Sequence, residues 1–206
     1  MYKPNDCNMA VIAGTLTEPL ETDHMLYGER FYTSKISVPR LSGTVDVLPV
    51  TIPERICLEL PQKGDMIRVE GQLRSYNKHT ESGSRLVITL FCHDIEFLSA
   101  DDETENHVEI TGYICKDAIY RTTPFLREIC DIIIAVNRSY NKSDYLPCIA
   151  WGRNAAFAKS LSVGTCVRIN GRFQSREYLK RFDDGSEELR TAYELSCSSL
   201  EEEYVT

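Results

Sequence analysis

The stretch VGTCVRINGRFQSREY, at residues 163–178, has an earlier counterpart in KGDMIRVEGQLRSY, at residues 63–76. Four residues recur one hundred positions apart: Gly64/Gly164, Arg68/Arg168, Gly71/Gly171 and Ser75/Ser175. Each stretch opens on a glycine and continues with the period of two that is typical of a β-strand. The chain therefore contains an internal repeat, and this strand is its clearest shared part.

The two faces of the later strand differ in chemistry. One face carries the apolar side chains of Val167, Ile169 and Phe173. The other face carries Arg168, Asn170, Arg172, Arg176 and Tyr178. We expect the first face to enter a hydrophobic core and the second to present guanidinium groups and an aromatic ring to solvent.

The length of 206 residues allows one large domain or two small ones, and the repeat favours two units of about 100 residues each. We predict an N-terminal domain at 1–99, an acidic solvated linker at 100–106 (ADDETEN) and a C-terminal domain at 107–206. The alternative is that the acidic stretch is a loop within one larger domain.

Each copy has the same predicted order of elements: three strands, a short helix and two further strands. The matching segments are 9–16 and 107–115, 31–40 and 130–138, 46–50 and 144–148, the helical 53–60 and 154–161, the glycine-led strand, and the return strands 85–98 and 189–200. Asn154 is the expected N-cap of the second helix. The sequence thus predicts an all-β protein of two tandem five-stranded OB-fold barrels, each with a short helix between strands 3 and 4.

The charge is unevenly distributed along the chain. The net charge is −8, which alone argues against a polyanionic ligand, because lysine and arginine contacts to phosphates dominate affinity for nucleic acid. Residues 8–99 carry −3 and residues 106–200 carry +2, so the acidic excess is concentrated in the connector and near residue 200. The second copy is therefore the better candidate for binding a polyanion.

Several motifs of the second copy resemble the bacterial single-stranded DNA-binding protein family. They are TG at 111–112, AVNRSY at 135–140, AWGRNA at 150–155, the stretch at 163–178, and the glycine hairpin DDGS at 183–186 before a return strand. The resemblance covers nearly all of 106–200. It implies a non-enzymatic protein that binds and protects single-stranded DNA during replication, recombination or repair.

The resemblance also implies which side chains stack on bases, and basic residues on the same strand face or nearby are the candidates for phosphate contacts. The base-stacking rings fall at Tyr140, Tyr145, Trp151 and Tyr178. The expected phosphate-binding cations are Arg153, Arg168, Arg172, Arg176 and Lys180. Rings interleaved with guanidinium groups suit binding without base-specific readout, because every base has a flat face.

A structural alternative stands beside each of these assignments. Tyr145 and Trp151 share their strand parity with Ile149 and would then be barrel core, and Phe157 is expected to plug the barrel.

The first copy departs from the ring pattern. It has Ser42, Val47, Pro53 and Lys78 at the four aromatic positions. We expect weakened or altered binding there, although Tyr27, Phe31 and Tyr32 offer another candidate surface.

Partners and chemistry follow from the same interpretation. The expected partners are single-stranded DNA, replication or recombination proteins, and a second copy in a homodimer. The alternative is a primosome-type assembly factor whose barrels chiefly hold proteins. No GxxxxGK[ST], HExxH or GxSxG motif occurs, so we expect neither an enzyme nor a cofactor.

The eight cysteines are scattered without a CxxC pair, so structural thiols are expected rather than a metal site or a disulfide framework. No membrane span or signal peptide is predicted, which favours a cytoplasmic location.

Overall fold

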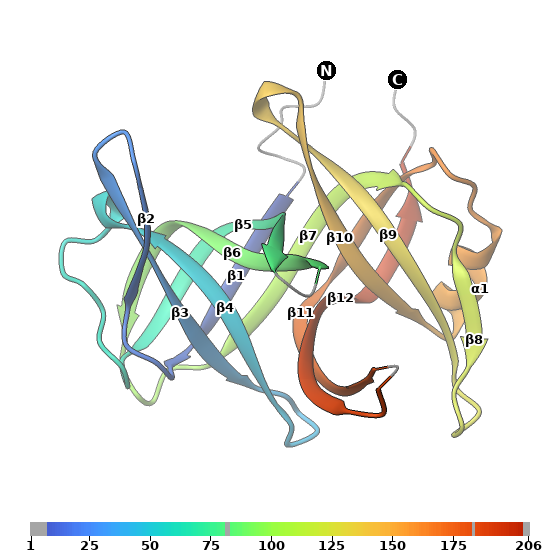
Figure 1. Cartoon of the computed structure of the whole chain (residues 1–206), viewed down its shortest axis with the longest axis horizontal. Coiled ribbons are helices and arrows are strands. Elements are labelled where there is room, and N and C mark those ends of the chain that lie inside the picture. The colour runs from blue at the N-terminus through green and yellow to red at the C-terminus, as the bar shows by residue number, and fades with distance from the viewer. Residues whose placement is uncertain (1–7, 81–82, 183, 204–206) are drawn as a thin grey trace.

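The computed structural model describes residues 8–80, 83–182 and 184–203. The first half contains β1 (Asn8–Leu16), β2 (Glu21–Leu26), β3 (Glu29–Pro39), β4 (Val45–Pro53), the 3-10 turn η2 (Glu54–Ile56), β5 (Met66–Thr80) and β6 (Gly83–Leu98). The second half contains β7 (Glu105–Ile114), β8 (Ile119–Thr122), β9 (Glu128–Arg138), the 3-10 turn η3 (Ser139–Asn141), β10 (Lys142–Trp151), α1 (Arg153–Ser160), β11 (Cys166–Arg181) and β12 (Glu187–Glu202). The predicted all-β class is confirmed, and the two halves lie next to each other (Figure 1).

Five strands of each half pair in a ring, which is the predicted OB-fold arrangement. In the first half the order is β3-β4-β6-β5-β1, and the β1–β3 pairing at Leu16↔Ile36 returns to the start. The β4–β6 pairing in that ring is parallel, as is its counterpart β10–β12. We call the two rings the first barrel (residues 8–98) and the second barrel (residues 105–202).

Three details differ from the sequence-based expectation. Two further strands, β2 and β8, extend β3 and β9 as hairpins. The expected helix at 53–60 is only the turn η2, because Pro53 and Pro61 flank the segment and the residue before a proline disfavours helical geometry. The helix α1 begins after Gly152, and Asn154 is not its N-cap; the Asn154 amide instead donates to the Ser198 carbonyl at 2.9 Å.

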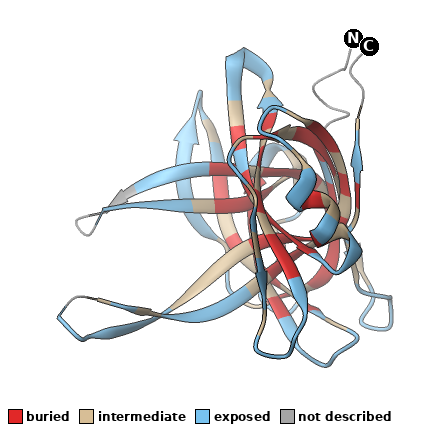
Figure 2. Ribbon diagram, turned by 90° about the vertical axis from the view of Figure 1, so that its right-hand side faces the viewer, coloured by how far each residue is buried: buried red, intermediate tan, exposed pale blue. Residues whose placement is uncertain are grey.

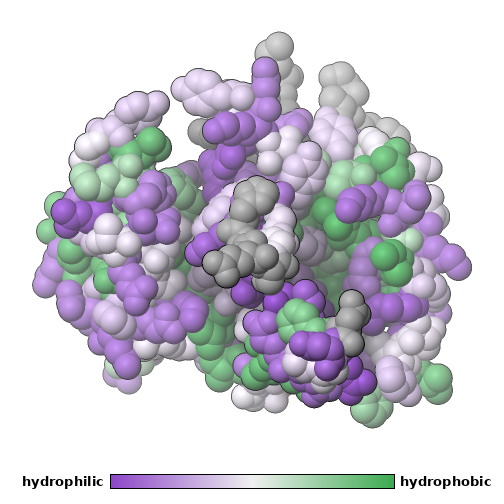
Figure 3. All heavy atoms as spheres, viewed as in Figure 1, coloured by the Kyte–Doolittle hydropathy of each residue, from purple (hydrophilic) through white to green (hydrophobic). Residues whose placement is uncertain are grey.

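The expected core face is confirmed in the second barrel. Val167, Ile169 and Phe173 are fully buried, and Phe157 of α1 packs against the same core, as predicted. Figure 2 shows buried residues gathered around the rings and exposed residues at the far ends of the hairpins. Figure 3 shows a largely hydrophilic surface with scattered hydrophobic patches on the face that it presents.

The cysteines of the described residues are unpaired thiols, of which Cys57 and Cys115 are partly exposed and five are buried; Cys7 lies outside the described residues. Among these residues no group of three or more His, Cys, Asp or Glu side chains could hold a metal ion. Within the same described ranges, no helix is long and apolar enough to cross a membrane.

The two barrels are joined in one sheet by an antiparallel seam between β1 and β7, from Asn8↔Ile110 to Ala13↔Glu105. Each seam strand has an asparagine whose side chain is hydrogen-bonded to the backbone of the next strand of its own barrel, which is β5 for Asn8 and β11 for Asn106. The Asn8 amide donates to the Leu73 carbonyl at 2.7 Å, and the Asn106 amide donates to Phe173 in the same way at 2.7 Å. The predicted linker at 100–106 overlaps β7, which begins at Glu105. Asn106 is therefore part of a strand and not of the connector.

Two buried aspartates link the barrels reciprocally. Asp46 of the first barrel accepts a hydrogen bond from the Ser175 backbone N–H at 2.7 Å, and it is ion-paired with Arg40. Asp144 of the second barrel accepts from the Ser75 backbone N–H at 2.7 Å and is ion-paired with Arg74 and Arg138. Each buried carboxylate thus has partners from both halves, as a buried charge requires.

Candidate nucleic-acid interface

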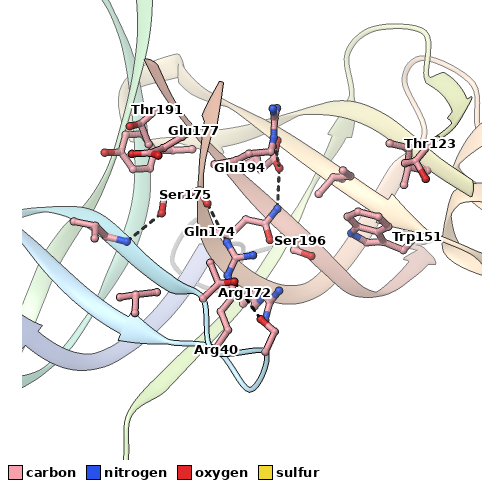
Figure 4. A pocket seen from close by; sticks show the side chains of 18 of the residues that line it. Arg40, Thr123, Trp151, Arg172, Gln174, Ser175, Glu177, Thr191, Glu194 and Ser196 are labelled. Atoms are coloured by element: carbon pink, nitrogen blue, oxygen red, sulfur yellow. Dashed lines mark hydrogen bonds and ion pairs between the residues drawn. The ribbon is translucent and has the colours of Figure 1, made fainter. Parts of the chain in front are cut away.

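A groove of about 980 Å³ runs between the outer surface of the second barrel and one hairpin of the first. The second barrel supplies side chains from the β8–β9 hairpin, β10, β11 and β12. The first barrel supplies Lys35, Arg40, Ser42, Thr44, Val45 and Val47 from β3, β4 and the turn between them. In Figure 4, Trp151 and Thr123 lie at one end of the groove and Ser175 and Glu177 lie at the other.

Three of the nine predicted binding residues line this groove together: Trp151, Arg172 and Arg176. Trp151 is the last residue of β10, and 38% of its surface is exposed. Tyr145, on the same strand, is 50% exposed, so neither ring belongs to the barrel core and that alternative is wrong for both. The Trp151 ring is therefore open to a ligand in the groove.

The groove carries six cationic side chains: Lys35, Arg40, Arg121, Arg127, Arg172 and Arg176. Four of these are paired with carboxylates, namely Lys35 with Glu18, Arg40 with Asp46, Arg121 with Asp131 and Arg176 with Glu194. Within the described part of the chain, Arg127 and Arg172 have no ion pair. These two guanidinium groups are the ones whose charge is least neutralised by the protein itself.

The pKa values of three of the paired cations, Lys35, Arg40 and Arg121, are shifted upward. The pKa of Lys35 is raised chiefly by its hydrogen bond with Glu18. Those of Arg40 and Arg121 are raised chiefly by their hydrogen bonds with Asp46 and Asp131. These groups therefore remain positively charged at any pH at which the protein is folded and phosphates are ionised.

Tyr178 and Lys180, two predicted binding residues further along β11, lie beyond the groove. The Arg176 guanidinium lies 5.9 Å from the centre of the Tyr178 ring, which is 38% exposed. The Lys180 ammonium lies 4.9 Å from the ring of Phe182. Cation–π contacts of this kind hold a ring and a charge side by side on one surface.

Arg168 shares this face of β11 but lies outside the groove. It is ion-paired with Glu203 at 2.8 Å and with Glu109 at 3.7 Å, on the part of the sheet next to the seam. Arg153, the first residue of α1, is exposed and also lies outside the groove. Neither of these two predicted cations therefore lines the groove that contains Trp151.

Tyr140 and Tyr145 lie outside the groove. Tyr140 lies in η3 with φ of 62° and is 94% exposed, and the Tyr145 backbone N–H donates to the Ser75 hydroxyl of the first barrel at 2.7 Å. Their counterparts, Ser42 and Val47, line the groove of the second barrel. Of the four predicted rings, Trp151 lines the groove, and Tyr140, Tyr145 and Tyr178 do not.

Four of the six cationic groove residues were missed in the sequence: Lys35, Arg40, Arg121 and Arg127. Arg121 and Arg127 flank the turn of the β8–β9 hairpin, where no alternating pattern predicts a strand. Lys35 and Arg40 come from the other copy of the repeat. The charge of each was visible, but its position beside Trp151 depends on tertiary structure.

The first barrel has a different surface at the equivalent place. Arg74 donates to the Gln72 side chain at 2.5 Å and is ion-paired with Asp144 at 3.2 Å. Its positive charge is therefore neutralised by a carboxylate of the protein itself. Of the three rings suggested for this barrel, Phe31 and Tyr32 are buried and only Tyr27 is fully exposed. Phe31 stacks on His24 with ring centres 4.7 Å apart.

Comparison with known proteins gives one family match. Residues 105–201 match the model of the Single-strand binding protein family. The chain is 34% identical over 80 residues to Single-stranded DNA-binding protein 1 of Staphylococcus aureus, covering 35% of this chain and 48% of that protein. It is 31% identical over 80 residues to Single-stranded DNA-binding protein 3 of Streptococcus agalactiae, covering 35% and 58%. The chain thus spans about half the length of the curated relatives that it matches.

Solved structures match the whole fold. The wild-type single-stranded DNA binding protein of Thermus aquaticus superimposes with a TM-score of 0.75 at 22% identity, covering 97% of this chain and 94% of that chain. A deletion mutant of the same protein gives a TM-score of 0.77 at 20% identity, covering 97% and 95%. The similarity therefore extends over both barrels.

Proposed function

We propose, because residues 105–201 match the model of the Single-strand binding protein family, that this chain binds single-stranded DNA through the groove of the second barrel. One observation carries the proposal: an exposed Trp151 lies in the same groove as Arg127 and Arg172, whose charges have no carboxylate partner among the described residues. A ring and unneutralised cations are what an unpaired polynucleotide needs.

The binding is proposed to be independent of base sequence. Stacking on an aromatic ring is worth about 1–3 kcal/mol per base and accepts any base. Arginines that contact phosphates add affinity without reading sequence. The biological role we propose is coating and protection of single strands in replication, recombination or repair, without catalysis.

Titration with oligo-dT at low salt tests the proposal. Trp151 is the single tryptophan of the chain, so its fluorescence reports on this groove alone. We expect quenching that saturates, and an affinity that falls as salt rises because phosphate contacts release counterions. A folded sample that binds no oligo-dT at low salt would reject the function.

A substitution tests the role of stacking on Trp151. Trp151→Ala is expected to weaken binding about 10-fold or more, measured by anisotropy of a labelled oligonucleotide. Tyr27→Ala is the control, because Tyr27 is equally aromatic and fully exposed but lies outside the groove. Equal losses in both variants would contradict a specific role of Trp151.

We further propose that the chain acts as a homodimer, which would bring four barrels together as the family resemblance implies. Sedimentation should then give twice the 23.5 kDa of one chain. Replication or recombination proteins are the proposed protein partners, and their capture by the DNA-bound chain is the corresponding assay.

A further inference from the structure

The turn that joins β8 to β9 lies beside Trp151. A second cavity, of about 530 Å³, is lined by Thr122, Leu126, Arg127 and Glu128 from the hairpin and by Trp151 and Gly152 from the end of β10. The backbone N–H of Gly152 donates to the Glu128 carbonyl at 3.0 Å, and Trp151 pairs with Ile129 in the sheet. The sheet therefore fixes the position of the hairpin relative to the ring.

The turn itself is held by three hydrogen bonds. The backbone N–H of Thr123 donates to the Arg127 carbonyl at 2.9 Å, and that of Leu126 donates to the Thr123 carbonyl at 2.9 Å. The Arg127 backbone N–H donates to the Thr123 hydroxyl at 3.1 Å. The side chains at the tip of the hairpin therefore project from a backbone whose conformation is fixed by hydrogen bonds.

This ordered tip presents apolar side chains to solvent. Phe125 is 86% exposed and Leu126 is 85% exposed. Leu126 also has a φ of 57°, in the left-handed region that favours glycine. The corresponding residue of the first copy, 98 positions earlier, is Gly28, with φ of 83°. A leucine at this position has an unfavourable backbone conformation and buries no side chain in the core. We infer that the Leu126 side chain contacts something outside the chain.

The surroundings identify the chemistry of that contact. The cavity is lined by an aromatic residue, Trp151, an apolar residue, Leu126, and a cationic residue, Arg127. A flat apolar surface and a cation suit an aromatic base that carries a phosphate. The first copy lacks both apolar partners, since Gly28 and Pro53 stand where the second copy has Leu126 and Trp151.

We propose that the β8–β9 turn is a nucleobase clamp, in which Leu126 closes over a base stacked on Trp151 while Arg127 contacts the adjoining phosphate. The ligand is one unpaired nucleotide of a longer strand. This inference rests on the proposed function and adds to it a second wall for the Trp151 subsite.

Leu126→Gly tests the clamp without threatening the fold. Glycine relieves the positive φ, so we expect unchanged or greater thermal stability. Affinity for oligo-dT, measured by anisotropy, should nonetheless fall about 5- to 20-fold, because one face of the base loses its contact. Leu126→Met keeps an apolar side chain and should bind nearly as the wild type does.

An abasic oligonucleotide distinguishes the clamp from a structural effect. Its phosphates are intact, so wild type and Leu126→Gly should bind it equally. The control is Leu58→Ala, which removes a fully exposed leucine outside both cavities and should bind both oligonucleotides as the wild type does.

The outcomes separate the two proposals. Wild type that binds oligo-dT with quenching, together with Leu126→Gly that binds equally well, would overturn the clamp and leave the function standing. An equal loss on oligo-dT and abasic strands would also overturn the clamp, because the base would then not be what Leu126 contacts. Wild type that binds neither oligonucleotide would reject the function and the clamp together.

Discussion

Two arginines four positions apart on β11 have opposite surroundings. Arg168 is ion-paired with Glu203 and Glu109, whereas Arg172 lines the groove and has no carboxylate partner among the described residues. A charge already neutralised within the protein contributes little to attracting a phosphate. At the scale of the residue, the environment of a side chain therefore matters more than its place in a row.

This contrast gives a prediction. Arg172→Gln should weaken binding of oligo-dT and lower the magnitude of the slope of log K against log salt by about 0.7, the value expected for one lost phosphate contact on a single strand. Arg168→Gln should change neither. Titrations at several salt concentrations measure both, and an equal loss of slope in the two variants would contradict the assignment.

The sequence predicts the exposed face of a strand better than the neighbours of each side chain on it. Alternation correctly placed Arg172 on the outward face of β11, because successive side chains of a strand point to opposite sides. It did not place Trp151, which shares its parity with the buried Ile149; the exposed position of that ring was implied by the family resemblance. It could not pair Arg168 with Glu203, which comes from a position beyond β12. Nor could it bring Lys35 to the groove, since that contact depends on how the two copies pack.

At the scale of the element, repeated spacing predicted the five-strand rings, and segments without alternation were missed. Every residue of β2 is exposed, so this strand has no buried face to leave a periodic pattern. Its counterpart β8 is only four residues long, with no buried residue. The β8–β9 hairpin, which presents Leu126, could therefore not be predicted from the sequence pattern, although it supplies part of the candidate site.

The strand glycines make a second prediction at this scale. A Cβ on Gly71 would lie 2.1 Å from the Phe91 carbonyl oxygen, at the bulge between β5 and β6. Gly71→Ala should therefore lower the free energy of unfolding by about 3 kcal/mol, the upper range for overpacking. Denaturant unfolding followed by far-UV circular dichroism measures it.

The control separates crowding from backbone conformation. A Cβ on Gly43 would meet nothing within 4 Å, but its φ of 84° disfavours other residues. Gly43→Ala should cost only about 1–2 kcal/mol, which is the penalty for left-handed backbone alone. A larger loss at Gly43 than at Gly71 would mean that the close approach of the two strands is not what requires glycine.

At the scale of the whole molecule, the seam and the reciprocal aspartates make each barrel part of the environment of the other. The β1–β7 pairing continues one sheet across both halves, and Asp46 and Asp144 each accept a backbone hydrogen bond from the opposite barrel. Unfolding one barrel alone would leave a buried carboxylate of the other without these partners, which is costly. The two barrels should therefore unfold together.

Trp151 allows this coupling to be measured, because the one tryptophan lies in the second barrel. We expect Gly71→Ala, a change in the first barrel, to shift the unfolding midpoint followed by Trp151 fluorescence as far as the midpoint followed by circular dichroism. Coincident transitions are the signature of a single cooperative unit. If the fluorescence midpoint stays at the wild-type value while circular dichroism shows two steps, the barrels unfold independently. The seam and the two aspartates would then be too weak to couple the unfolding of one barrel to that of the other.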